Sequence, residues 1–71
     1  MNIKQKFGEK VKFFRTKKEW SQEKLALEAG IDRTYLPGIE KGERNVSITV
    51  VEKLAIALGI EIKEFFEEEV K

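Results

Sequence analysis

The stretch SQEKLALEAGIDRTYLPGIEKG, residues 21–42, decides the fold. Ser21 offers a hydroxyl cap to a short helix that ends at Gly30, because glycine adopts the left-handed turn at little steric cost. Asp32 is the next cap, and Gly42 closes the segment that it begins. The stretch therefore predicts two helices, at about 21–29 and 32–41, joined by a short turn.

Apolar residues on both sides of this stretch recur at helical spacing. Phe7, Val11 and Phe14 predict an amphipathic helix over residues 3–18. Ser47 caps a helix at 47–58, and a last short helix is expected at 61–69. The expected inward residues of the helix at 47–58 are Ile48, Val51, Leu54, Ala55 and Leu58, and the apolar residues of the last helix are Ile62, Phe65 and Phe66. Five helices with short connections and no period-two alternation predict a compact all-α domain.

Length and composition exclude several classes of protein. A chain of 71 residues is expected to form one small domain, residues 1–71, and not a multidomain enzyme. The sequence has no Cys and no His, which removes disulfides, thiolate or imidazole metal sites and histidine general bases. We therefore expect no enzyme activity, no cofactor and no metal. No apolar run reaches the roughly 18 residues of a membrane span, so the expected location is the cytoplasm, with no membrane partner.

Charge is distributed unevenly along the chain although the net charge is only +1. Residues 1–20 carry seven Lys or Arg against two Glu, whereas residues 61–71 carry two Lys against five Glu. This asymmetry suits a protein that presents one face to a polyanion while its other end stays acidic. Solvated helix faces are the alternative explanation.

The two helices joined through Ala29-Gly30-Ile31 have the dimensions of a helix-turn-helix, whose second helix fits a major groove about 12 Å wide. The run from Ser21 to Gly42 resembles the Cro/repressor-type helix-turn-helix family of phage and bacterial regulators, and this resemblance implies a lambda-repressor-like fold. Asp32-Arg33-Thr34-Tyr35, Gly38-Ile39-Glu40 and Arg44-Asn45-Val46-Ser47 are similar to the controller proteins of bacterial restriction-modification systems. The resemblance implies a sequence-specific regulator that binds its own promoter, on the nucleoid, as a dimer.

The resemblance also implies a role for individual residues. Arg33 and Thr34 begin the recognition helix, whose first turn reaches base edges. Arg15 and Glu40 match a structural ion pair of the family. The expected contacts to the DNA backbone are Gln22, Tyr35, Lys41, Arg44, Asn45 and Ser47.

Each of these roles has a plainer alternative. Gln22 is otherwise an ordinary exposed helix residue, and Arg33 is otherwise a phosphate contact without base readout. Tyr35 is otherwise a core residue, and Asn45 is otherwise a turn former.

Pro37 departs from the controller pattern, in which a small polar residue usually precedes the glycine. Its ring crowds the carbonyl of Arg33, and its missing N–H leaves that carbonyl without its usual helical partner. We therefore expect the recognition helix to be kinked or locally loosened at Pro37. A hydrogen-bonding contact to a base is expected to be missing there.

The last two helices carry more apolar surface than one small core needs, which predicts a two-fold interface. Its expected residues are Val50, Ile56, Ile62, Phe65 and Phe66. The alternative is that Ile62 and Phe65 only cover the core of the monomer. The expected partners are a double-stranded DNA operator and a second copy of the chain. RNA polymerase is a further candidate, through Glu23 or the run Glu67–Glu69.

Other functions remain open on the sequence alone. Within the same fold, the chain is alternatively a phage-type repressor or an antitoxin. A different class is a protein-interaction module whose basic first helix is only solvated, and such a module would bind DNA weakly or without salt dependence.

Overall fold

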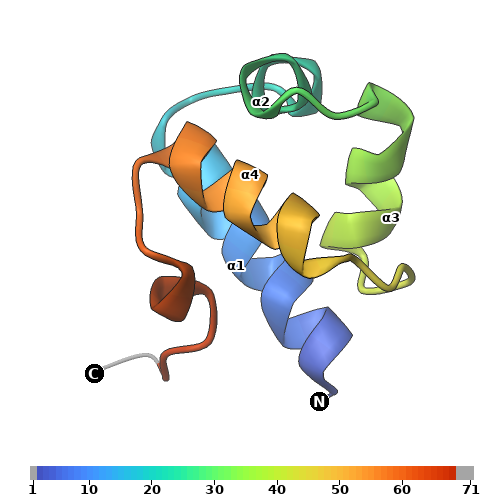
Figure 1. Cartoon of the computed structure of the whole chain (residues 1–71), viewed down its shortest axis with the longest axis vertical. Coiled ribbons are helices and arrows are strands. Elements are labelled where there is room, and N and C mark those ends of the chain that lie inside the picture. Colours follow the sequence, from blue (N-terminus) through green and yellow to red (C-terminus); the bar gives the residue numbers. More distant parts are fainter. Residues whose placement is uncertain (1, 69–71) are drawn as a thin grey trace.

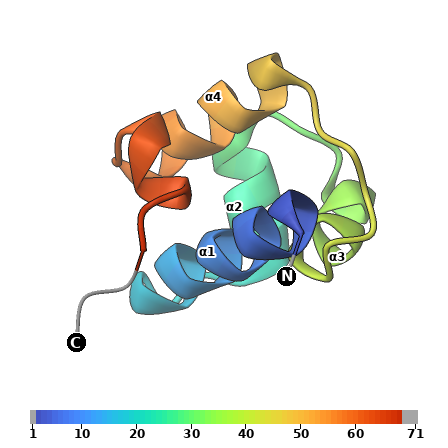
Figure 2. The ribbon, with the colours of Figure 1, turned by 90° about the horizontal axis from the view of Figure 1, so that it is seen from below.

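The computed structural model describes residues 2–68, and every regular element within that range is helical. The elements in chain order are α1 (Ile3–Lys17), α2 (Gln22–Ala29), the 3-10 turn η1 (Arg33–Tyr35), α3 (Leu36–Glu40), α4 (Ile48–Leu58) and the 3-10 turn η2 (Ile62–Phe65). The predicted all-α class is therefore confirmed for this part of the chain. In Figure 1 and Figure 2, α3 and η2 lie on opposite sides of the molecule, with α1 and α4 between them.

The predicted caps set the helix boundaries. The Ser21 hydroxyl accepts the backbone N–H of Lys24 at 3.0 Å, and the Ser47 hydroxyl accepts that of Val50 at 3.1 Å. Each bond satisfies one of the amide groups that the first turn of a helix leaves without a partner. Gly30 ends α2 with a φ of 71°, a left-handed conformation that favours glycine.

The core lies where α1, α2, α3 and α4 meet, and η2 closes one side of it. Its buried apolar residues are Phe7, Val11, Leu25, Ala26, Ala29, Leu36, Ile39, Val51, Leu54, Ala55, Leu58 and Phe65. Gly8 allows α1 to approach the end of α3, because a Cβ at this position would lie 2.2 Å from the carbonyl oxygen of Ile39. This close approach fixes α3 against α1.

The predicted recognition helix is divided into two parts. Residues 33–35 form the 3-10 turn η1, and α-helical geometry begins only at Leu36. The N–H of Leu36 bonds to the carbonyl of Arg33, three residues back, where Pro37 has no N–H to offer. The loosening that was predicted at Pro37 is confirmed.

The helix predicted at 61–69 is wrong in its extent. Only Ile62–Phe65 is helical, as a single 3-10 turn, and Glu69 lies outside the described residues. Phe65 is drawn into the core, and on a continued helix Glu67 and Glu68 would lie three and four residues beyond Glu64, where like charges repel. The structure thus has four α-helices and two 3-10 turns in residues 2–68.

Ile48 was expected to face the core, and this expectation is also wrong. It is the first residue of α4 and is 83% exposed, whereas Val51, Leu54, Ala55 and Leu58 form the inward stripe of the helix. No helix in residues 2–68 has the length and apolar character that crossing a membrane requires.

Candidate nucleic-acid interface

The candidate interface is built on α2 and the turn that joins it to η1. Gly30 reverses the chain, and the N–H of Ile31 bonds back to the carbonyl of Ala26 at 3.0 Å. Ile31 also packs against the core, so the turn is anchored on one side. As a result, the first turn of the predicted recognition helix begins on the surface beside α2.

Asp32 organises that first turn. Its carboxylate accepts the backbone N–H of Thr34 at 2.9 Å and the Thr34 hydroxyl at 2.8 Å. These two hydrogen bonds, the backbone one first, hold the pKa of Asp32 below its ordinary value. The Thr34 hydroxyl donates its proton to Asp32, so it presents lone pairs and a methyl group to an incoming ligand.

Arg33, the predicted base reader, is exposed and forms an ion pair. Its guanidinium forms an ion pair with the carboxylate of Glu23 on α2, and about two thirds of each side chain is accessible to solvent. Exposed pairs of this kind contribute little to stability because water screens them. Arg33 can therefore leave Glu23 for a stronger acceptor at small cost.

Gln22, the predicted phosphate contact, is held by a hydrogen bond to Glu40. Its side-chain amide donates to Glu40 Oε1 at 3.0 Å, and that carboxylate also accepts Arg15 Nε at 2.7 Å. Arg15 donates further to the carbonyl of Trp20 at 2.7 Å. The sequence pattern had not indicated Trp20 as part of this network, since backbone carbonyl acceptors leave no residue signature.

Four of the six predicted backbone-contact residues come together at one shallow hollow between α3 and the start of α4. They are Tyr35, Arg44, Asn45 and Ser47, and Ile39, Val46 and Val50 complete the lining. The Arg44 guanidinium lies over the Tyr35 ring, with Cζ 5.0 Å from the ring centroid. The two other residues, Gln22 and Lys41, do not line this hollow. Lys41 is exposed at the end of α3.

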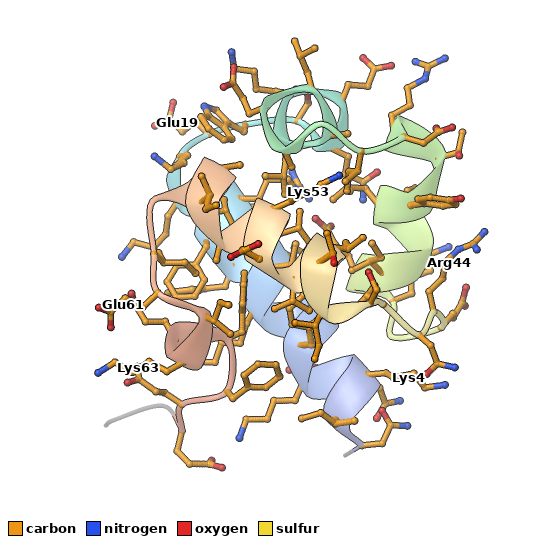
Figure 3. The ribbon with its side chains drawn as sticks, viewed as in Figure 1. Lys4, Glu19, Arg44, Lys53, Glu61 and Lys63 are labelled. Carbon is orange, nitrogen blue, oxygen red and sulfur yellow. The ribbon has the colours of Figure 1, made fainter. Side chains whose placement is uncertain are left out.

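The charged residues of the α3 side and of the η2 side are well separated. Figure 3 shows Arg44 on the side of α3, while Glu61 and Lys63 lie on the opposite side of the molecule. Glu68 follows η2 and bonds to Lys6 of α1 at 2.9 Å, which lowers the pKa of Glu68. Part of the basic charge of α1 is therefore neutralised within the chain.

The predicted dimer residues differ in their exposure. Ile56 is 73% exposed, Ile62 is 40% exposed and Phe66 is 37% exposed. Val50 is partly buried against the core. Phe65 is completely buried, with its ring centroid 4.8 Å from that of Phe7, so its assignment to an interface is wrong.

Comparisons with known proteins all point to one family. The sequence matches the helix-turn-helix family over residues 11–65. It is 46% identical over 67 residues to the control protein C.BamHI of Bacillus amyloliquefaciens, a match that covers 93% of this chain and 83% of that protein.

Solved structures point to the same family. The restriction-modification controller protein C.AhdI from Aeromonas hydrophila superposes with a TM-score of 0.84 at 50% identity, covering 87% of this chain and 94% of that one. The biofilm regulator SinR of Bacillus subtilis, solved in complex with DNA, superposes with a TM-score of 0.81 at 31% identity, covering 86% and 98%.

Proposed function

The chain belongs to the helix-turn-helix family of DNA-binding transcriptional regulators, and from this membership we propose that it controls its own promoter in the manner of a restriction-modification controller. The observation that carries the proposal is the first turn after Gly30, where Arg33 and Thr34 stand exposed beside α2. Its resemblance to C.BamHI and C.AhdI supports the narrower assignment. In this proposal residues 1–71 act as one DNA-binding domain without enzyme activity.

Base readout is assigned to Arg33 and Thr34. The Arg33 guanidinium leaves Glu23 and bonds to the two acceptors of a guanine in the major groove. The Thr34 hydroxyl donates its hydrogen bond to Asp32, so its oxygen accepts one from an exocyclic amine of a base. Alternatively, the Thr34 methyl group packs against a thymine methyl.

Phosphate contacts are assigned to the residues around this turn. Gln22 lies in the first turn of α2, where unsatisfied backbone N–H groups and the helix dipole favour an anion. Arg44 supplies charge from the edge of the hollow. The remaining backbone contacts in this proposal are Tyr35, Lys41, Asn45 and Ser47.

We propose that two copies of the chain bind one operator. The supporting observation is the exposed apolar set on α4 and near η2, formed by Ile48, Ile56, Ile62 and Phe66 with Val50 at its margin. Pairing of this set about a two-fold axis removes it from water and sets two recognition turns against half-sites about one helical turn apart.

Activation would add RNA polymerase as a partner. We propose that the acidic residues after η2, including Glu67, contribute to that contact. Glu67→Lys is then expected to reduce activated transcription in vitro at a promoter that the regulator saturates, while occupancy of the operator stays unchanged. Since the proposed ligand is operator DNA, the proposed location is the cytoplasm, on the nucleoid.

The proposal is tested with the DNA upstream of the chain's own gene. Fluorescence anisotropy with that duplex, and with an unrelated duplex of equal length, is measured at about 50 and 200 mM salt. We expect tighter binding to the upstream duplex and a steep loss of affinity for both duplexes as salt rises. Weak binding to both duplexes that ignores salt would instead support a protein-interaction module.

A further inference from the structure

We propose that Gly38 is a positioning residue for DNA binding, because its bare Cα lets Arg44 cross α3 and stack its guanidinium on Tyr35. This inference rests on the proposed function, in which Arg44 contacts the DNA backbone. It deepens that function by assigning a role to a residue that touches neither base nor phosphate in the proposal.

The Arg44 side chain runs directly past Gly38. A Cβ built on Gly38 would lie 3.0 Å from Arg44 Cγ, 3.2 Å from Nε and 3.5 Å from Cδ. The nearest heavy atoms to this missing methyl group thus all belong to one side chain. Beyond this point the guanidinium reaches the Tyr35 ring, with Cζ 5.0 Å from the centroid.

Backbone geometry does not explain a glycine at this position. Gly38 lies within α3 and is absent from the glycines with positive φ, which are Gly30, Gly42 and Gly59. Alanine would favour the helix more than glycine does. Gly8 differs, since a Cβ there would meet the carbonyl oxygen of Ile39, an atom of the backbone.

The stacked arrangement matters because an exposed arginine otherwise samples many rotamers. Binding to phosphate then requires that freedom to be lost, which weakens affinity. With Gly38 the guanidinium is already held over the Tyr35 ring, and Arg44 lines the hollow together with Asn45 and Ser47. A methyl group at position 38 requires the stem of Arg44 to move by a few tenths of an ångström. In this proposal that shift loosens the stack of the guanidinium on Tyr35.

Two measurements test the inference with the full chain. The first is the NMR chemical shift of the Arg44 δ-methylene protons without DNA, in the wild type and in Gly38→Ala and Tyr35→Leu variants. The second is the affinity for operator DNA of the wild type, Gly38→Ala, Arg44→Ala and the double variant, together with the thermal unfolding midpoint of each.

We expect ring-current shifts of the Arg44 protons in the wild type and their loss in both variants. Gly38→Ala is expected to weaken binding about twofold to fivefold on all sequences, the range that an exposed cation–π contact implies. Its unfolding midpoint is expected to be equal to or higher than that of the wild type. In the Arg44→Ala background, Gly38→Ala is expected to change affinity by much less.

Three results would overturn the inference. Arg44 protons that keep their shifts in Gly38→Ala would show that the stack does not need glycine. An equal loss of affinity in both backgrounds would mean that the α3 backbone itself approaches DNA at Gly38. An Arg44→Ala variant that binds DNA as tightly as the wild type would show that Arg44 does not contribute to affinity, so that its position would not matter. Only failure of the wild type to bind DNA at all would overturn the proposed function as well.

Discussion

Arg15 and Glu40 are joined by two parallel hydrogen bonds, Nε to Oε2 at 2.7 Å and Nη2 to Oε1 at 2.9 Å, with side chains only 12% and 5% exposed. The bond to Glu40 raises the pKa of Arg15, so the guanidinium stays charged. Because Gln22 shares the same carboxylate, the pair ties α1 and the end of α3 to the first turn of α2. The two helices of the helix-turn-helix are thus held in register by one ionic network.

Breaking this pair on one side is expected to be costly. Arg15→Met leaves the Glu40 carboxylate buried without a countercharge, and we expect a loss of about 3 kcal/mol in the free energy of unfolding. The double variant Arg15→Met/Glu40→Met is expected to lose less than Arg15→Met alone, because neither charge is then left unpaired. Urea denaturation of the variants measures this coupling, and additive losses would contradict it.

Gly8 is expected to tolerate no side chain. In Gly8→Ala the new methyl group meets the carbonyl oxygens of Ile39 and Glu40, and backbone atoms cannot turn aside as a side chain can. We expect at least about 2 kcal/mol of destabilisation and weaker DNA binding, because α3 must move away from α1. Gly30→Ala is the control, since its Cβ has no neighbour within 4 Å and only the left-handed φ is strained. A smaller loss in Gly8→Ala than in Gly30→Ala would contradict this account.

Asp32 gives the stability a dependence on acid pH. Its pKa is lowered in the folded state, so its contribution is fully present at pH values well above 3.8 and is lost as the pH falls through the native pKa. The Asp32→Asn variant keeps a side chain that can cap the turn, but this side chain does not titrate. We therefore expect the gap in unfolding midpoint between wild type and Asp32→Asn to be constant near neutral pH and to shift against the wild type in acid. A gap that stays the same from about pH 7 to about pH 2 would show that Asp32 does not carry this dependence.

Arg33 and Gln22 are expected to affect DNA binding in different ways. Arg33→Ala is expected to cost about 1–3 kcal/mol on the operator and to relax the preference at one base pair. Gln22→Ala is expected to weaken binding to all sequences alike. Thermal unfolding of Arg33→Ala serves as the control and is expected to change little, because the pair with Glu23 is exposed. Uniform losses in both variants would remove Arg33 from base readout.

The proposed dimer interface is best tested on α4. Ile56→Glu is expected to shift the chain to monomers in sedimentation and to weaken operator binding, because a carboxylate would then lie in an apolar interface. Leu27→Glu is a matched control, since Leu27 is 75% exposed on α2 against 73% for Ile56. Equal sedimentation of the two variants would place the interface elsewhere.

Much of this fold could be predicted because its signals are local. Ser21, Asp32 and Ser47 each cap the segment that follows them, and Gly30 and Gly59 each end a helix in the left-handed conformation. The effect of Pro37 is also local, since proline acts on the turn that precedes it. The family follows from the same stretch, residues 21–42, and the match over residues 11–65 confirms it.

The exposure of the last apolar residues could not be predicted in this way. Helical spacing gave Phe65 and Phe66 the same character, yet the first is completely buried and the second is 37% exposed. Their burial depends on the path of the chain after Gly59, which brings Phe65 against Phe7 and Phe14. Spacing likewise placed Ile48 inward, but it is the first residue of α4 and is 83% exposed.

Two contacts of the site residues are non-local and left no pattern in the sequence. Glu23 and Arg33 are ten residues apart on different elements, and surface ion pairs follow no spacing rule across a turn. Gly38 stood in the sequence as part of the controller pattern, but its contact with Arg44 depends on how the loop after α3 folds back. The roles of Arg33, Thr34 and the phosphate contacts stay predictions until DNA is bound.

The most direct test of the central claim is selection from a random pool of DNA duplexes, followed by sequencing and repeated at two salt concentrations. A dimer that reads bases through Arg33 and Thr34 predicts one two-fold symmetric motif, with half-sites about one helical turn apart and retained guanines that Arg33→Ala no longer selects. Selection of no motif at either salt, with weak binding that salt does not change, would contradict sequence-specific DNA recognition by this chain.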